Sequence, residues 1–473
     1  MRSVGGTGAL ARMSLREASV DAIRRFGVNR TVLYSILTRG TQGVAALASI
    51  ILVGRFLDRA TQGYYFTILS LVAFVQLAEF GLTYAVMQSA SHETGHPAFE
   101  LASSPGSHVS NRLAALLRGA TRFNAATTWL GALLIAGVGT TILRSADAPA
   151  AVGSSPWALP WAAALFAVAG GQLLNPRISL LEGAGFVTEV WRFRLQQEIV
   201  TAIALGTALV SGCGLWAISV TYAVRAGLGL LWLNRAWRRD YFAHLRLQYA
   251  NASRSYWRHE VWPFQWRIGA SALSGYLIFQ FFTPLMFTLK GPTIAGQFGM
   301  TLALTNGLLT VTTAWLNSQA PLFGQLIARR AFGELDRVFA RSLKSSLFVV
   351  VVIGAVMSLA VVALDRLQHP LAQRLLPPAA FALFVASTVT NHVVFAMAIY
   401  LRAHRREPLM ISSIAGAVVT PIVVSYAGRH AEVTAIAGSY LGLTVLGLGV
   451  TMAIYWSRSR AWHSDSYIVS RRS

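Results

Sequence analysis

The chain has 473 residues, of which 54% are hydrophobic and only 12% are charged, and its formal net charge is +22. A soluble domain normally carries about 25% charged residues, so this composition excludes an ordinary soluble enzyme or binding domain. The apolar residues come in blocks of about twenty, which is the length of helix that crosses a bilayer. The sequence therefore predicts an all-α integral membrane protein.

Twelve apolar blocks follow an Arg-rich N-terminal segment, residues 1–30, and we interpret each block as a transmembrane helix. The fifth and sixth blocks are separated only by Ser211-Gly212-Cys213-Gly214, whose small residues allow a tight turn. The predicted spans are 31–53, 64–87, 122–143, 157–182, 195–212 and 214–234, then 266–289, 298–324, 345–364, 378–401, 409–427 and 432–456.

The basic residues predict the orientation of these spans. With the N-terminus in the cytoplasm, the inside segments carry 29 of the 40 Lys and Arg residues and the outside loops carry seven. Loops rich in Lys and Arg stay in the cytoplasm, so both termini are expected there. We interpret the net charge of +22 as this topological signal and expect no nucleic-acid partner.

The longest loops, 88–121 and 235–265, both lie on the predicted cytoplasmic side, and the second divides the chain into six spans plus six. We therefore expect an N-lobe at 31–234, a cytoplasmic linker at 235–265, a C-lobe at 266–456 and a cytoplasmic tail at 457–473. A shift of 233 positions aligns Gly63-Tyr64-Tyr65 with Gly296-Gln297-Phe298. Because both halves have an even number of spans, the repeat is parallel, as in transporters built from two bundles.

Charged residues inside spans are costly and are functional candidates by default. Four arginines fall inside spans, all in the cytoplasmic half of the membrane: Arg39, Arg177, Arg225 and Arg267. Gathered together, they would form a cationic cavity, since guanidinium groups bind phosphate oxygens in bidentate geometry. Alternatively, they extend to the lipid headgroups. Glu79 in the second span could pair with an arginine, bind a coupling proton or Na⁺, or have a structural role.

The eighth span is unusually polar and includes Asn306 and Asn317. Its amides and hydroxyls could line a path for sugars, or they could form hydrogen bonds between helices. Catalytic signatures are missing: there is no Walker loop, no zinc-protease motif and no nucleophile elbow. The single cysteine, Cys213, excludes an intramolecular disulfide and a cysteine-based metal cluster. We therefore expect a transporter with no cofactor rather than an enzyme.

Several local motifs resemble those of polysaccharide flippases, the Wzx-like branch of the multidrug/oligosaccharidyl-lipid/polysaccharide flippase superfamily. Their order and spacing extend the resemblance over residues 30 to about 456. The family commonly has Asp where this chain carries Glu79. The matching segments are Gly54 to Tyr65, Leu77-Ala-Glu-Phe-Gly81-Leu82, Pro321 to Arg341 with its Phe332-Gly333-Glu334-Leu335-Asp336, and Tyr400-Leu401-Arg402-Ala403.

The resemblance implies two six-helix lobes that form a V and open alternately to each side of a bacterial inner membrane. It implies a cargo of undecaprenyl-diphosphate-linked glycan for exopolysaccharide, capsule or O-antigen synthesis, with Arg39 and Arg267 as cavity cations. A polysaccharide polymerase and a chain-length regulator would be the protein partners. Two alternatives stay open: a multidrug or cation antiporter of the same superfamily, and a membrane glycosyltransferase or polysaccharide polymerase.

Overall fold

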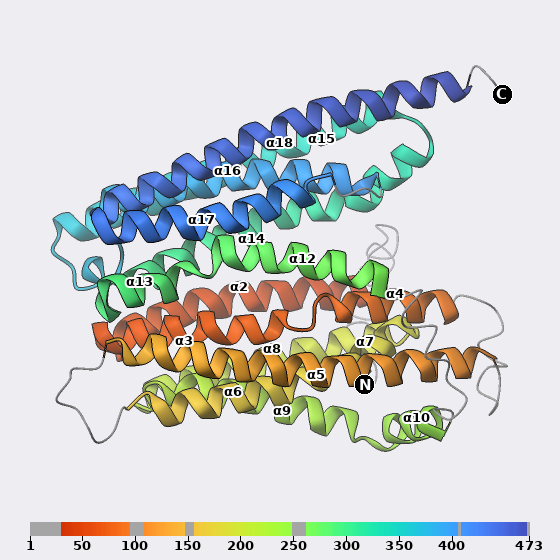
Figure 1. Cartoon of the computed structure of the whole chain (residues 1–473), viewed down its shortest axis with the longest axis horizontal. Helices are drawn as coiled ribbons and strands as arrows, with labels where there is room; N and C mark the ends of the chain where they lie inside the picture. The colour runs from red at the N-terminus through yellow and green to blue at the C-terminus, as the bar shows by residue number, and fades with distance from the viewer. Residues whose placement is uncertain (1–29, 95–107, 147–155, 248–261, 405–407, 471–473) are drawn as a thin grey trace, which may run out of the picture.

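The computed structural model describes residues 30–94, 108–146, 156–247, 262–404 and 408–470, and these contain helices but no strands. The helices run roughly along one direction in two groups (Figure 1). The first group contains α2 (Arg30–Phe56), α3 (Arg59–Leu77), α4 (Leu82–Thr94), α5 (His108–Arg144), α6 (Ala158–Gln172), α7 (Asn175–Gly183), α8 (Val187–Val210), α9 (Trp216–Leu233) and α10 (Ala236–Leu247). The second contains α12 (Trp262–Phe279), α13 (Phe282–Lys290), α14 (Pro292–Ala328), α15 (Phe332–Arg366), the short η4 (Ala372–Arg374), α16 (Pro378–Ala403), α17 (Met410–His430) and α18 (Val433–Ser470).

Within the described residues, eleven helical segments are long and apolar enough to cross a membrane. The predicted fifth span is the one that this criterion leaves out. It corresponds to α8, which has 24 residues and packs between α2 and α9, but carries charged residues such as Arg194 and Glu198 in its first half. The tight turn predicted after α8 is confirmed, since Gly212 and Gly214 both have positive φ angles, 75° and 56°.

Three spans that the sequence predicts as continuous are broken in the structure: α3 and α4 form one, α6 and α7 the next, and α12 and α13 the third. Conversely, α5 begins at His108 and α15 begins at Phe332, so each helix starts well before its predicted span, 122–143 and 345–364 respectively. Helix α18 likewise continues to Ser470, through most of the predicted tail 457–473. Residues 1–29, and residues 248–261 of the predicted linker, lie outside the described residues.

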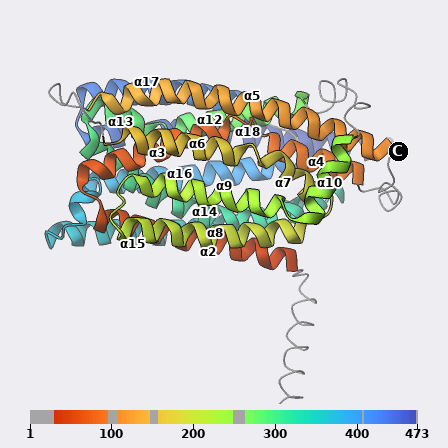
Figure 2. The same ribbon diagram turned by 90° about the horizontal axis from the view of Figure 1, so that it is seen from below.

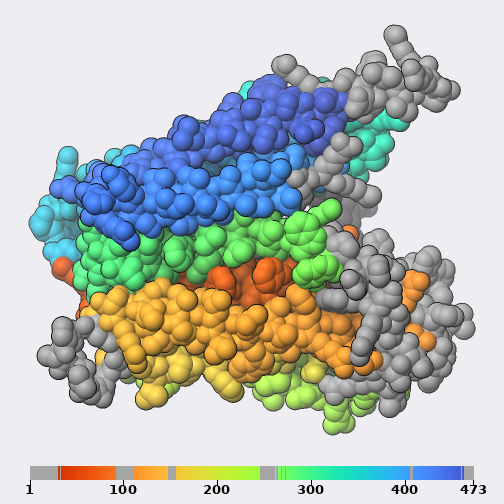
Figure 3. All heavy atoms as spheres, in the orientation of Figure 1, coloured from red at the N-terminus to blue at the C-terminus, as the bar shows by residue number. Residues whose placement is uncertain are grey.

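The two groups of helices share a hydrophobic core at one end only. At the end where α2 meets α3, one cluster contains residues of both groups, for example Val53 of α2 and Phe384 of α16. At the opposite end, where α2 begins, each group has its own cluster, around Leu116 in the first and around Phe323 in the second. The groups are therefore two lobes that are joined at one end, and α18 rises away from the first lobe toward the other end (Figures 1 and 3). The view turned by 90° shows the helices of each lobe running roughly parallel (Figure 2).

The lobes touch most closely where α3 crosses α14. A Cβ atom added to Gly63 would lie 1.9 Å from the carbonyl oxygen of Pro292, and one added to Gly296 would lie 2.9 Å from the backbone nitrogen of Gly63. Gly63 and Gly296 are the positions that the 233-residue shift equates. The repeat thus brings equivalent residues of the two lobes together at their joined end.

The side chain of Gln62 forms hydrogen bonds across the same contact between the lobes. The Gln62 amide donates hydrogen bonds to the carbonyl oxygens of Gly296 (3.0 Å) and Arg374 (3.1 Å), and its oxygen accepts one from the Arg374 guanidinium (3.2 Å). Gln62 is only 1% exposed, and all three of these partner groups belong to the second lobe. We call this contact between α3, α14 and η4 the lobe junction.

Asp58 caps the first turn of α3 beside the lobe junction. Its carboxylate accepts hydrogen bonds from the backbone N–H groups of Ala60 and Thr61, each 2.9 Å long, and from the Thr61 hydroxyl. Partial burial acts to raise the pKa of this carboxyl group, but the hydrogen bonds outweigh it and hold the pKa below its ordinary value. The cap is therefore present at neutral pH and is lost only as the pH falls through the lowered pKa.

Replacing Asp58 with Ala is expected to destabilise the protein by about 1 kcal/mol, the usual cost of losing an N-cap. The thermal unfolding midpoint of the purified protein, measured at neutral pH, should fall accordingly. Asp58→Asn is the control, because Asn caps helices as well as Asp does. Equal loss in both variants would mean that the charge of Asp58, and not its cap, matters.

Candidate functional site

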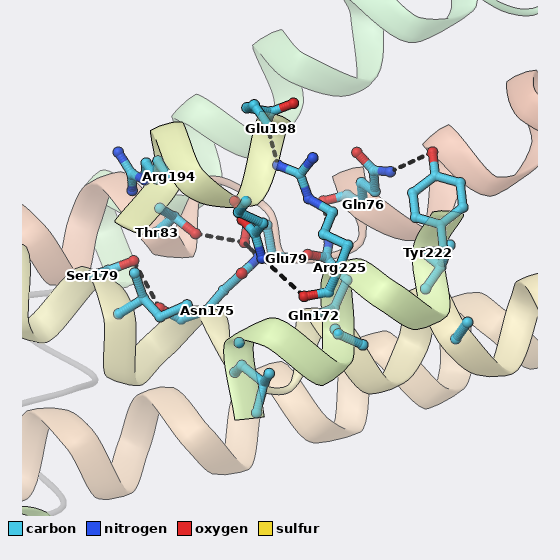
Figure 4. A pocket seen from close by; sticks show the side chains of 18 of the residues that line it. Gln76, Glu79, Thr83, Gln172, Asn175, Ser179, Arg194, Glu198, Tyr222 and Arg225 are labelled. Carbon is cyan, nitrogen blue, oxygen red and sulfur yellow. Dashed lines mark hydrogen bonds and ion pairs between the residues drawn. The ribbon is translucent and has the colours of Figure 1, made fainter. Parts of the chain in front are cut away.

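A cavity of about 610 Å³ lies inside the first lobe, enclosed by α2, the α3–α4 pair, the α6–α7 pair, α8 and α9. We call it the N-lobe cavity. Figure 4 shows its polar side chains converging from these helices. Its polar lining consists of Gln42, Gln76, Glu79, Thr83, Gln172, Asn175, Ser179, Arg194, Gln197, Glu198, Tyr222 and Arg225.

The break between α3 and α4 places Glu79 at this cavity. Phe80 and Gly81 both have left-handed backbone angles, with φ of 49° and 70°, which interrupt the helix. Side chains donate to carbonyl groups at the break: Gln172 donates to the carbonyl oxygen of Gln76 (2.9 Å), and Gln265 donates to that of Glu79 (3.3 Å). Because Gln265 belongs to α12, the break is also a point of contact with the second lobe.

The break between α6 and α7 lies against the first one, since α7 packs on α4. Pro176 follows Asn175 at the start of α7, where a residue without an N–H group is tolerated. The carbonyl oxygen of Gln172 accepts a hydrogen bond from Asn124 of α5 (2.7 Å). The Asn175 amide donates to the Gln172 side chain and to the Glu79 carboxylate (3.4 Å), so that it joins the two breaks.

Two ion pairs occupy the cavity wall. Arg194 binds Glu182 with two hydrogen bonds, of 2.7 and 3.2 Å. Arg225 binds Glu198 at 2.9 Å, and the same carboxylate oxygen accepts a hydrogen bond from Gln42. Both cavity guanidiniums are therefore held by their own carboxylates.

Glu79 has no such counter-charge among the described residues. Its carboxylate accepts hydrogen bonds only from the Thr83 hydroxyl (2.6 Å) and, at 3.4 Å, from Asn175. Glu79 thus stays the single carboxylate of the cavity lining that is not in an ion pair with a described residue.

The four arginines of the predicted cationic cluster do not meet at the N-lobe cavity. Only Arg225 lines it. Arg39 is exposed on α2, and Arg267 is exposed on α12 with its guanidinium 5.8 Å from the centre of the Trp266 ring. Arg177 is half-buried on α7 and makes a contact of its own.

Arg39 instead belongs to a line of residues along one side of α2. Successive members are three or four positions apart, so they lie on the same face of the helix. At the joined end the line is buried, at Ile50 and Val53; at the other end it is exposed, at Ala46, Gln42 and Arg39.

A second line runs along α14 in the same way. It begins with Gly296 and Gly299, which are buried against Gly63 and Phe66 of α3. It continues with half-buried Asn306 and exposed Asn317, and it also includes Thr310 and Thr313. Both lines begin buried at the contact between the lobes, since α14 packs on α2 and α3, and both become exposed and polar toward the opposite end. We call the surfaces that these two lines mark the inter-lobe cleft.

The hydroxyl groups of α14 mostly bond within their own helix. Thr305, Thr312 and Thr313 each donate to the carbonyl oxygen four residues earlier, at 2.7 to 3.0 Å. These three threonines therefore do not donate the hydrogen bonds between helices that were one predicted role for the polar residues of this span. Asn317 makes no side-chain hydrogen bond with a described residue, which leaves its amide for the cleft.

Sequence reasoning missed most of the N-lobe cavity. Its carboxamides are spread over four predicted spans and form no motif: Gln42, Gln76, Gln172, Asn175 and Gln197. The Asn175-Pro176 pair was the usable signal, because a proline inside an apolar span indicates a helix interruption.

No protein-family model and no curated protein sequence matches this chain, but solved structures do. A multidrug resistance MATE family transporter of the MOP superfamily in its inward-facing conformation is 12% identical and has a TM-score of 0.63, covering 89% of this chain and 98% of that one. A mutant of the Vibrio cholerae MATE transporter VcmN is 12% identical with a TM-score of 0.57, covering 92% and 97%. The lipid II flippase MurJ in an inward closed conformation is 11% identical with a TM-score of 0.54, covering 93% of each. The protein thus has the all-helical, two-lobed fold of MATE transporters and MurJ.

Proposed function

We propose that this protein is a flippase that moves a polyprenyl-diphosphate-linked oligosaccharide from the cytoplasmic to the periplasmic leaflet of a bacterial inner membrane. Movement would occur by alternating access of the two lobes, without covalent chemistry. The cargo would serve exopolysaccharide, capsule or O-antigen synthesis, with a polymerase and a chain-length regulator acting downstream. The fold shared with a lipid II flippase and the motifs that resemble polysaccharide flippases support this proposal.

The observation that carries the proposal is the inter-lobe cleft. Its borders on α2 and α14 are polar at the open end, with Arg39, Gln42, Asn306 and Asn317, although the helices are otherwise apolar. Polar residues deep in a membrane protein indicate a path for a polar substrate. The open end is the predicted cytoplasmic end, where a lipid-linked cargo is made available.

The exposed guanidinium of Arg39 suits the diphosphate of such a cargo. Among the described residues, Arg39 forms no ion pair, so its charge is available to a ligand. A guanidinium can bind phosphate oxygens with two parallel hydrogen bonds. The sugars would follow into the polar cleft while the polyprenyl chain stays in the bilayer. Arg177 and Arg267 are further candidates for the headgroup along the same entrance.

Replacing Arg39 with Ala in a native host is expected to lower surface glycan by about tenfold or more, because a hydrogen bond to a charged group contributes about 1.5–3 kcal/mol. Surface glycan is measured by immunoblotting and normalised to the membrane level of each variant. Arg225→Ala is the second variant, and a similar loss is expected because Glu198 then loses its partner in the cavity wall.

Arg55→Ala is the matched control, since Arg55 is exposed on the same helix at the opposite end. It should leave surface glycan unchanged. Normal export by both Arg39→Ala and Arg225→Ala would contradict the proposal that these cations bind the cargo or support its path.

A second candidate function is multidrug or cation antiport, and a multidrug resistance MATE family transporter shares this fold. The observation that favours it is Glu79, a cavity carboxylate without a described counter-charge. Growth of a deletion strain in ethidium or tetraethylammonium, with and without the plasmid-borne gene, separates the two functions. We expect no gain of resistance, whereas resistance that depends on Glu79 would favour the antiporter.

A further inference from the structure

We infer that the N-lobe cavity is a binding site for the sugar part of the cargo, selective for neutral or amine-bearing sugars over anionic ones. This inference rests on the proposed flippase function and deepens it, because it assigns the diphosphate and the sugars to different places. The diphosphate would stay in the inter-lobe cleft at Arg39, and the N-lobe cavity would receive sugar hydroxyl and amine groups.

The first observation concerns the carboxamide side chains that line the cavity, all of which direct their NH₂ groups to the protein. Gln42 donates to the Glu198 carboxylate (3.1 Å), Gln197 to the carbonyl oxygen of Arg225 (2.9 Å), and Gln76 to the Tyr222 hydroxyl (3.1 Å). Gln172 and Asn175 donate to groups at the two helix breaks, as described above. Except for the Tyr222 hydroxyl that Gln76 contacts, these partners can only accept hydrogen bonds, so they fix which end of the other amides is nitrogen.

The amide oxygen atoms are consequently left for a ligand. The side-chain oxygens of Gln42, Gln76, Asn175 and Gln197 accept no hydrogen bond from the described residues, although all four residues line the cavity. Glu79 adds a carboxylate to them. The cavity therefore presents mainly acceptors, and its complement is a molecule rich in O–H and N–H donors, such as a sugar.

The second observation is the charge of the lining. The lining carries two carboxylates, of Glu79 and Glu198, and two guanidiniums, of Arg194 and Arg225. Each guanidinium is already in an ion pair, Arg225 with Glu198 and Arg194 with Glu182, which is outside the lining. The tyrosine hydroxyl of Tyr222 is the remaining titratable group of the described lining. Glu79 is left without a counter-charge. A protonated amine would supply that counter-charge, whereas a uronic acid or a diphosphate would place a further negative group beside this carboxyl group.

The third observation is the position of Gln42, which belongs both to the cavity lining and to the exposed line on α2. The cavity is therefore reached from the inter-lobe cleft. Arg39 lies one helical turn away from Gln42, about 4.5 Å along the axis. A diphosphate held at Arg39 would thus place the attached sugar at the mouth of the cavity.

The test measures binding of small probes to the purified full-length chain in detergent by saturation-transfer NMR titration. The probes are glucosamine, glucose, glucuronate, pyrophosphate and tetraethylammonium. We expect glucosamine to bind at least about tenfold more tightly than glucuronate, a difference of about 1.4 kcal/mol, and glucose to bind measurably. In Glu79→Gln the preference for glucosamine over glucuronate should shrink to within about twofold, with glucose binding retained.

Glu189→Gln is the matched control, because it makes the same change of charge on exposed α8 surface outside the cavity lining. It should keep the wild-type preference. Arg39→Ala should weaken pyrophosphate binding and leave glucosamine binding as it is, which tests the separation of the two parts of the cargo.

Equal binding of glucuronate and glucosamine by the wild type would overturn the inference. So would a Glu79-dependent site for tetraethylammonium at which neither glucose nor glucosamine binds. The binding assay and the surface-glycan assay fail separately: sugar selectivity can be absent while Arg39→Ala still abolishes export, in which case only the sugar site is wrong.

Discussion

Replacing Gly63 with Ala is expected to force the lobes apart at the lobe junction and to shift the protein away from the conformation that this structure shows. The added Cβ atom would lie 1.9 Å from the carbonyl oxygen of Pro292. A backbone atom cannot rotate aside as a side chain can, so α3 and α14 must separate. Overpacking of this kind costs about 1–3 kcal/mol, and such a difference shifts a two-state equilibrium by roughly 5- to 150-fold.

Solvent access at the junction reports the shift. Cys213, the only cysteine of the chain, is exposed and can be replaced with Ser. Met300 is 2% exposed beside Gln62 and Gly54, so Met300→Cys in that background should react slowly with a water-soluble maleimide. Adding Gly63→Ala should accelerate its labelling by at least about fivefold.

Two further variants test whether the backbone clash is the cause of the faster labelling. Gly296→Ala should act in the same sense as Gly63→Ala, because its Cβ atom would meet the backbone of Gly63 at 2.9 Å. Gly307→Ala is the control on the same helix, since nothing lies within 4 Å of its Cβ position. Labelling that is equally fast in the Gly307→Ala and Gly63→Ala backgrounds would mean that the close approach does not hold the junction closed.

The sequence predicted the membrane architecture well because long apolar helices satisfy their backbone hydrogen bonds internally and must be about twenty residues long. The tight turn at Ser211–Gly214 was predicted from small residues alone and is confirmed by the positive φ angles of its glycines. The structure also explains why both aligned positions, Gly63 and Gly296, are glycines. These positions lack side chains because they face each other across the lobe junction.

The helix breaks were not predicted, because hydropathy over a window of twenty residues is insensitive to two residues with left-handed backbone angles. At Phe80 and Gly81 the break depends on tertiary partners, Gln172 and Gln265, that supply the missing hydrogen bonds. These two hydrogen bonds join residues that are 96 and 186 positions apart in the sequence. Local patterns of hydropathy do not indicate such long-range contacts.

The candidate site was predicted in part. Of the arginines chosen for their depth in the membrane, Arg225 lines the N-lobe cavity, whereas Arg39 and Arg267 do not, because depth assigns no direction around the helix axis. The expectation of a mainly basic cavity also failed to anticipate that Arg194 and Arg225 are each paired with a carboxylate of another helix or turn. Whether Arg39, Arg177, Arg267, Asn306 and Asn317 contact the cargo stays a prediction.

The second large effect is expected at Gly183, where α7 crosses α4. A Cβ atom there would lie 2.2 Å from the carbonyl oxygen of Met87 and 2.7 Å from the Cβ atom of Ala90. Gly183→Ala should therefore push α7 away from α4 at a cost of about 1–3 kcal/mol. Because Asn175 on α7 and Thr83 on α4 both hold the Glu79 carboxylate, the same displacement should loosen the N-lobe cavity.

Two measurements distinguish this packing effect from a general loss of stability. The thermal unfolding midpoint of Gly183→Ala should fall by about 1 °C for each kcal/mol lost, because the unfolding entropy grows with chain length. The preference for glucosamine over glucuronate should decrease in the protein that stays folded. Gly170→Ala, on the adjoining helix α6, has nothing within 4 Å of its Cβ position. Ala is favoured over Gly inside a helix by about 0.5–1 kcal/mol, so this control should be as stable as the wild type or slightly more so. If Gly183→Ala matches it in both measurements, the α4–α7 crossing does not position Glu79.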